Sequence, residues 1–346
     1  MARHGHGANV GSGALGVVFI CAVLSVLEVS LSFDNAVVNA AVLRNMTPLW
    51  RHRFLTWGIL IAVFGMRIVF PLVIVGVVAA LNPWDAIVLA ATNPDEYARL
   101  MQSAHIPVAA FGGAFLLMVA LKYFFDTRKD VHWISHIERP LIKLGKLGGV
   151  ELATAMIILY AISRKLSETD ALTFLVAGIF GLITFILVDG VSSMLEGGDH
   201  KFGETSDNKT EKKTKSIQEL HKASAGMFLY LEVLDASFSF DGVVGAFAIT
   251  NNLFIIAIGL GIGAMFVRSL TILLVDKGTL TEYVFLEHGA FYAIGALAAI
   301  MFLNTFVHIH EVVTGLIGAA FIGMSFISSI RYNKKQLSAA PARAHK

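Results

Sequence analysis

Long apolar runs, with most of the charge gathered between them, constrain the fold of this chain more than any other feature. A helix needs about 20 mostly apolar residues to cross the hydrocarbon of a bilayer. The runs therefore predict an all-α fold, a polytopic transmembrane helix bundle of about nine spans. Their approximate limits are 13–43, 54–80, 106–124, 148–164, 172–190, 223–250, 253–275, 288–306 and 312–330.

The composition agrees with this prediction. Hydrophobic residues make up 56% of the 346 residues and charged residues only 15%, which is typical of a membrane protein. The formal net charge of +2 gives no reason to expect a nucleic-acid partner, whereas the lipid bilayer is an expected one. The single cysteine, Cys21, excludes a disulfide framework within the chain. The sequence leaves a homo-oligomer open.

Basic residues cluster after the first, third, fifth and ninth runs, which lie on one side of the membrane if there are nine spans. Since basic loops stay in the cytoplasm, the N-terminus is predicted outside and the C-terminus in the cytoplasm. The expected division is an N-terminal tail (1–12), a first transmembrane repeat (13–124), a cytoplasmic basic loop (125–147), a linking transmembrane hairpin (148–190), a cytoplasmic Lys-rich loop (191–222), a second transmembrane repeat (223–330) and a cytoplasmic tail (331–346).

Two motifs within the apolar runs match each other. LEVSLSFDNAVV (27–38) aligns with LDASFSFDGVVG (234–245), and the run after each motif carries an arginine at a matching place, Arg67 and Arg268. The two motif-bearing runs are five crossings apart, so they are predicted to run in opposite directions. This pattern predicts an inverted-topology repeat of three-helix units, with a shared site near the bilayer midplane.

The motifs place carboxylates where they are costly. An ionisable group at the centre of a bilayer costs roughly 2.5–3.5 kcal/mol on insertion scales, so it normally faces the interior of the bundle and marks a pathway. Four motif acids and two arginines leave a formal charge of −2, which a divalent cation would balance. The alternative is a set of ion pairs that only hold the bundle together.

The ligand chemistry of the motifs is that of oxygen, which suits magnesium, calcium or manganese and disfavours zinc or copper. The candidate metal ligands are Glu28, Ser32, Asp34, Asn35, Asp235, Ser239 and Asp241. Arg67 and Arg268 are expected to balance their charge, with Glu232 and Asn39 as accessory residues. In the basic loop, His132 and His136 are expected to be solvated.

The helical phase of the first motif indicates a break. Glu28 and Asp34 fall about 120° apart on an ideal helix. Either the helix is unwound around Ser32–Asp34, which the spacing favours, or the two acids serve different partners. Gly242 and Gly245 make a similar break plausible in the second motif.

At these residues the chain resembles the TerC family of integral membrane proteins, named for tellurium resistance and similar to the LysE-type exporters. The resemblance is carried by LEVSLSFDNAVV, by the second motif and by the arginine that follows each. It implies a multi-pass protein of the bacterial cytoplasmic membrane and a link to manganese efflux. The family usually has a serine where this chain has Gly242, which leaves a divergent branch open.

Together these features predict a transporter that exports a divalent metal cation, manganese before calcium or magnesium, by cation/proton exchange. The cation is a substrate, and neither an enzymatic activity nor a prosthetic group is expected. One rival is a membrane phosphatase-like enzyme for lipid-linked substrates, which would need a histidine or a nucleophile near the arginines. The other is a non-transporting scaffold of a tellurite or stress-resistance complex, supported only by the Lys-rich loop.

Overall fold

The computed structural model describes residues 8–129, 131–195, 217–247, 249–307 and 309–343, with side chains from residue 13 except at 217–219, 240, 241 and 337–343. All regular elements within these ranges are helices, which confirms the predicted all-α class. They are α1 (Ala8–Leu31), α2 (Phe33–Leu43), α3 (Pro48–Leu60), η1 (Ile61–Val69), α4 (Phe70–Val78), α5 (Pro83–Thr92), α6 (Pro94–Ser103), α7 (His105–Phe125), α8 (Ser135–Leu144), α9 (Val150–Ser163), α10 (Glu168–Leu195), α11 (Ile217–Ala246), α12 (Leu253–Asp276), α13 (Thr279–Glu282), α14 (Leu286–Leu303) and α15 (Glu311–Arg343).

Among the described residues, seven stretches are long and apolar enough to cross a membrane, so the predicted number of about nine is too high. The predicted span 148–164 is reduced to α9, whose 14 residues reach only about 21 Å, short of the roughly 30 Å hydrocarbon core. The predicted span 223–250 forms α11, which is long enough but carries Glu232, Asp235 and Asp241. The chain is therefore a multi-pass membrane protein by helix length and hydropathy.

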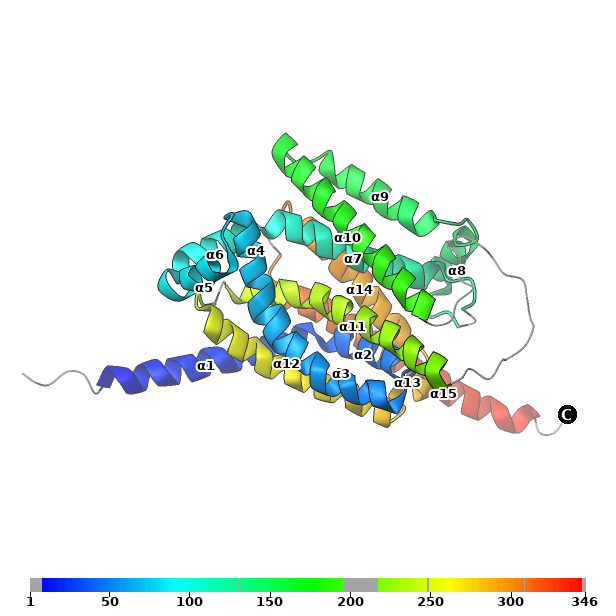
Figure 1. Ribbon diagram of the computed structural model, residues 1–346. Coiled ribbons are helices and arrows are strands. Elements are labelled where there is room, and N and C mark those ends of the chain that lie inside the picture. Colours follow the sequence, from blue (N-terminus) through cyan, green and yellow to red (C-terminus); the bar gives the residue numbers. More distant parts are fainter. Residues whose placement is uncertain (1–7, 130, 196–216, 248, 308, 344–346) are drawn as a thin grey trace, which may run out of the picture.

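Helix α7 lies at the centre of the bundle. Buried residues make up 67% of the apolar stretch of α7, compared with 11% of the stretch Gly13–Leu31 in α1. Around it pack α10, α14, α9 and α11, and Figure 1 shows the α9–α10 hairpin along one flank. Large apolar side chains on the outer helices remain uncovered, such as Phe19 of α1 (70% exposed) and Phe180 of α10 (58%). A bilayer would cover such a surface.

The first motif contains a helix break. Helix α1 ends at Leu31, Ser32 has φ −102° and ψ 16°, and α2 starts at Phe33. This agrees with the break that the phase of the motif predicts. The second motif has none: α11 continues through Gly242 and Gly245 to Ala246, and runs opposite to α1 (Figure 1).

The helix after the first motif is also irregular. Between α3 and α4 the chain forms the π-helix η1, which contains Arg67. Pro71 lies two residues after the end of η1, in the first turn of α4. A proline in a regular α-helix lacks the N–H that would bond the carbonyl four residues earlier, here that of Arg67. A π-helical segment accommodates such a mismatch. The matching helix α12 has no proline and is α-helical throughout.

Candidate functional site

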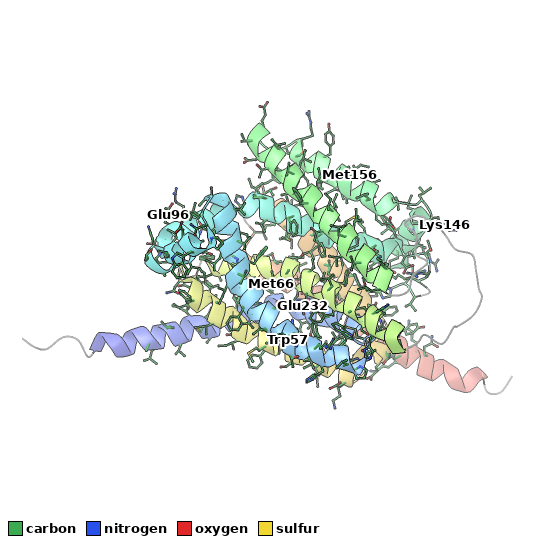
Figure 2. All side chains as sticks on the ribbon, viewed as in Figure 1. Trp57, Met66, Glu96, Lys146, Met156 and Glu232 are labelled. Carbon is green, nitrogen blue, oxygen red and sulfur yellow. The ribbon has the colours of Figure 1, made fainter. Side chains whose placement is uncertain are left out.

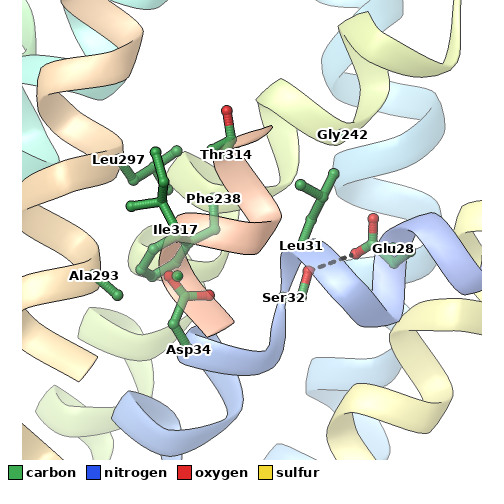
Figure 3. Close-up of a pocket in the computed structure, with 11 residues that line it drawn as sticks. Glu28, Leu31, Ser32, Asp34, Phe238, Gly242, Ala293, Leu297, Thr314 and Ile317 are labelled. Atoms are coloured by element: carbon green, nitrogen blue, oxygen red, sulfur yellow. Dashed lines mark hydrogen bonds between the residues drawn. The ribbon is translucent and has the colours of Figure 1, made fainter. Parts of the chain in front are cut away.

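The break at Ser32 places two buried carboxylates on different helices. Glu28 lies in the last turn of α1 and is 3% exposed, and Asp34 lies in the first turn of α2 and is 5% exposed. Figure 3 shows them on opposite sides of the break. The end of α1 contributes carbonyl oxygens with partial negative charge, while the start of α2 favours the acidic Asp34.

The two oxygens of Glu28 have different surroundings. Oε1 accepts hydrogen bonds from the guanidinium of Arg67 and from the hydroxyl of Ser32, the latter at 3.2 Å. Oε2 faces α11 at Gly242, where an added Cβ would lie 3.1 Å from it. One oxygen is therefore held by the arginine, and the other is left to the space beside α11.

That space is a cavity between α1, α2, α11, α14 and α15. Asp34 reaches it from the other side: its Oδ1 accepts the backbone N–H of Asn35 at 2.9 Å, and its Oδ2 lies near Gly318. The described residues that line it carry two acidic side chains and no basic one: Glu28, Leu31, Ser32, Asp34, Phe238, Gly242, Ala293, Leu297, Thr314, Ile317 and Gly318. We call it the acidic cavity (Figure 3).

Thr314 is the one lining residue with an oxygen side chain that the sequence analysis did not single out. It lies in the run EVVTGLIGAA at the start of α15. This ten-residue run contains no charged residue after Glu311, so its composition does not mark a polar site. The available sequence signal is its spacing of four residues from Gly318, which places a hydroxyl group and a glycine on the same face of the helix.

Glu28 and Ser32 also line a second cavity. Both arginines, Arg67 and Arg268, lie in the wall of this second cavity. The other polar residues of its wall are Asn35, Asn39, Asp235 and Thr271. Asn35 Nδ2 donates to Asp235 Oδ1 at 2.5 Å, which joins the first motif to the second. The amide oxygens of Asn35 and Asn39 are buried without a hydrogen-bond partner. We call it the arginine cavity.

The two arginines make different contacts. Arg67 is 2% exposed and donates both to Glu28 and to the carbonyl of Ala62 within η1. Arg268 lies between two carboxylates, 3.5 Å from Asp235 Oδ2 and 3.8 Å from Glu232 Oε1.

Arg268 is held largely by α3. It donates to the carbonyl of Phe54, and its guanidinium lies 4.0 Å from the centre of the Phe54 ring. Glu232 in turn has no hydrogen-bond partner on either oxygen, and Figure 2 places it in the middle of the bundle. The tightly bonded arginine thus belongs to the first motif and the loosely shared one to the second.

The structure brings together most of the residues that the motifs predict, but in two groups. Within the described side chains, no three His, Cys, Asp or Glu residues lie close enough to hold a metal ion together. Ser239 is buried on α11 outside both cavity walls, and the side chain of Asp241 lies outside the described residues. Both predicted arginines contact motif acids, Arg67 with Glu28 and Arg268 with Asp235, and their charge-balancing role stays a prediction.

The expectation for the basic loop is wrong at His132. Its side chain is 20% exposed, and its Nδ1 lies 3.6 Å from the buried carboxylate of Glu138. A histidine in a basic segment looks solvated by composition alone, because its burial depends on how α8 docks against the bundle. His136 is exposed as expected.

A family model described as "Protein of unknown function (DUF475)" matches residues 33–336, and the chain belongs to this family. The resemblance to the TerC family and the LysE-type exporters is wrong, because neither was found. The match begins at Phe33, after Glu28, so the acid that opens the motif lies outside it. A few polar residues in an apolar helix are too short a pattern to identify a family. No curated protein and no solved structure matches the chain.

Proposed function

We propose that this member of the DUF475 family is a transporter that exports a divalent metal cation across the bilayer by exchange with protons. One observation carries the proposal. The acidic cavity is lined by two buried carboxylates and two hydroxyl groups, with no basic side chain among its described residues. Such a cavity within a membrane protein attracts cations and marks a transport pathway.

The ligand set indicates which cations fit. Glu28 Oε2, Asp34 and the hydroxyls of Ser32 and Thr314 offer hard oxygen ligands, supplemented by carbonyls at the end of α1. These ligands suit magnesium, calcium or manganese. The preference for manganese rested on the resemblance to the TerC family and is withdrawn with it.

The contact between Arg67 and Glu28 supplies a way to couple binding to a conformational change. In the described conformation, the arginine occupies Glu28 Oε1 and leaves Asp34 on the far side of the break. A cation between the two carboxylates would draw them together and compete with the guanidinium for the same carboxylate. Protons compete for the same oxygens, so release of the cation is accompanied by protonation.

The arrangement of the helices supports alternating access and an orientation. Helices α1 and α11 run in opposite directions, as an inverted repeat requires. Both arginines line one cavity together with Glu28 of α1 and Asp235 of α11. In Figure 1, α8 lies at the same end as the last turns of α10 and α15, opposite α5 and α6. We place that basic end in the cytoplasm and the start of α1 outside.

The proposal is tested with purified protein in liposomes that contain a fluorescent indicator for divalent cations. Manganese, calcium and magnesium are added separately, and internal pH is recorded with each. Cation flux with opposite proton movement is expected for at least one ion, and Asp34→Asn should abolish it. Glu96→Gln is the control. Glu96 lies at one end of the bundle, where it pairs with Arg99, and it lines neither cavity (Figure 2). Flux that is equal in Asp34→Asn and the wild type would remove the acidic cavity from the pathway.

A further inference from the structure

Outside the two cavities, one carboxylate among the described residues is completely buried. Glu138 in α8 is 0% exposed. Its Oε1 accepts the backbone N–H groups of Trp133 (3.2 Å) and Ile134 (3.1 Å), and the Tyr292 hydroxyl of α14 at 3.4 Å. Its Oε2 has no hydrogen-bond partner. A buried carboxylate oxygen without a partner is costly, so its surroundings need an explanation.

Three nitrogen atoms surround that oxygen just beyond hydrogen-bond distance. His132 Nδ1 and His288 Nε2 each lie 3.6 Å from Oε2, and Lys129 Nζ lies 3.9 Å from it. The lysine also lies 3.5 Å above the ring of Tyr123 in α7. His288 Nε2 additionally contacts the carbonyl of Val131 at 2.8 Å. These contacts dock residues 131–144, which we call the latch, onto α7 and α14.

Among the described residues, the cluster has one acidic group and three groups that can carry a positive charge. Lys129 already balances Glu138, and its burial lowers the pKa of its ammonium group to about 8. A further proton on either histidine therefore adds a positive charge close to the lysine, and within the described part of the chain neither histidine contacts a second carboxylate. The other charged or titratable groups nearby are Tyr123 on α7, Asp126 and Arg128 beside Lys129, Tyr292 and Glu287 on α14, and Arg44 on α2, which forms an ion pair with Glu287.

The sign of the effect follows from linkage. Because the pKa of Lys129 is depressed in the docked state, its proton opposes docking. That opposition is complete below about pH 8 and declines as the pH rises from there towards the ordinary lysine pKa of about 10.4. A proton on either histidine acts in the same direction, because it places a second positive charge beside Lys129 and like charges repel. Histidine is also the side chain that ordinarily titrates in the physiological range.

We propose that His132, His288 and Glu138 form a proton-binding site that releases the latch from α14 when the surrounding solution becomes acidic. The site is separate from both cavities and has the proton as its ligand. The release itself does not depend on the transport proposal.

The latch is connected to the acidic cavity through one helix. His288 lies near the start of α14, and Ala293 and Leu297 of the same helix line the cavity. The neighbouring Glu287 binds Arg44 at 2.9 Å, just after the end of α2, whose first turn carries Asp34. Release of the latch would free this end of α14 beside α2. If the proposed function and orientation hold, acidification of the cytoplasm raises the rate of cation export.

The latch contains its own reporter, because Trp133 packs edge-on against Tyr292 of α14 with ring centres 5.5 Å apart. The experiment uses the full chain in lipid nanodiscs with the other three tryptophans, Trp50, Trp57 and Trp84, replaced by phenylalanine. Acrylamide quenching of Trp133 is measured from pH 8 to pH 5. Quenching should rise several-fold on acidification, with its midpoint inside this pH range.

The variants separate a proton-binding site from a merely structural contact. His132→Gln with His288→Gln should abolish the rise, while His136→Gln, the exposed histidine of the same segment, should keep the wild-type curve. Lys129→Met should move the midpoint to lower pH, because Glu138 can then balance the first protonated histidine. Quenching that does not change with pH in the wild type, or an unchanged rise in the double histidine variant, would overturn the proposal. Neither outcome bears on cation transport in liposomes.

Discussion

Residues 27–38 and 234–245 share the spacing of acid, serine and aspartate, but their backbones differ. The first motif divides into α1 and α2 at Ser32, whereas α11 carries the second motif without interruption. The glycines of the second motif allow close approach instead of a break. A Cβ at Gly245 would lie 2.5 Å from Glu311 Cγ, and one at Gly242 would lie 3.1 Å from Glu28 Oε2. The second motif thus forms one wall of the acidic cavity, and the first motif supplies the two carboxylates of that cavity.

The arginines differ in the same way. Arg67 bonds Glu28 and its own π-helical backbone, while Arg268 is shared by Glu232 and Asp235 at distances of 3.8 and 3.5 Å. Arg67 therefore has a close carboxylate partner, whereas Arg268 is held by Phe54 and makes only longer contacts with its two carboxylates. Under the proposed transport function, the first motif would bind the cation and the second would adjust to it.

The largest effect is expected from the carboxylates. Asp34→Asn should abolish cation transport, and Asp235→Asn should reduce it less, because Asp235 lines only the arginine cavity. Loss of an outer-shell partner typically costs about 10–100-fold in metal affinity, and loss of a ligand should cost more. Flux in liposomes measures both. A larger loss in Asp235→Asn would reverse the assigned roles, and Asp241→Asn tests the remaining motif aspartate.

Removal of an arginine should destabilise the protein unequally. Arg67→Met leaves Glu28 buried without its partner, a change that costs about 3–5 kcal/mol for a buried pair. Arg268→Met should cost less, because its carboxylate contacts are longer. Arg67→Lys should fall between the wild type and Arg67→Met, since lysine keeps the charge but not the planar fork. Thermal unfolding in detergent gives the order, and equal losses for both methionine variants would remove the distinction between the arginines.

A methyl group beside Arg268 tests how tightly that side chain is placed. A Cβ at Gly58 would lie 2.1 Å from Arg268 Nη1 and 2.4 Å from Glu232 Oε1, so the arginine must move. Gly58→Ala should cost about 1–3 kcal/mol, the usual range for overpacking. Gly65→Ala is the matched control, because its Cβ would meet only Ile61 Cγ2 at 3.5 Å. Unfolding temperatures of the two variants should differ clearly, and identical values would contradict the close contact.

The smallest effect is expected at the wall of the acidic cavity. Gly242→Ala places a methyl group 3.1 Å from Glu28 Oε2, which a shift of a few tenths of an ångström relieves. Cation affinity should fall only a few-fold, equivalent to about 0.5–1 kcal/mol. Titration calorimetry with the divalent cation that gives flux measures it. No change at all would mean that Glu28 Oε2 does not face the cation.

The sequence predicts the elements that follow from periodicity and charge. The break at Ser32 is recoverable because Glu28 and Asp34 are out of phase on one helix, and the contacts of both arginines follow from the need to pair charge in an apolar bundle. About nine spans are predicted, and seven of the described stretches meet the length and hydropathy of a span. The numbers differ because α9 has only 14 residues and α11 carries three acids within residues 223–250, and apolar composition alone does not reveal either.

Other features depend on contacts between segments far apart in the chain. Thr314 reaches the site only because α15 packs against α1 and α2, and His132 is covered only because α8 docks beside α14. No local pattern around either residue encodes that packing. The continuity of α11 is similar, because Gly242 and Gly245 are compatible with a break, and their neighbours Glu28 and Glu311 use the space instead.

The π-helix η1 also sets the angle at which its arginine leaves the helix. The segments 58–67 and 259–268 align without a gap, so Arg67 and Arg268 are the same number of residues from their aligned starts. A π-helix turns through a smaller angle per residue than an α-helix, because its hydrogen bonds span five residues. Equal spacing along the chain therefore becomes unequal rotation around the axis. The proline after η1 thus helps to direct one arginine to α1 and its counterpart towards α3 and α11, which breaks the symmetry of two aligned segments.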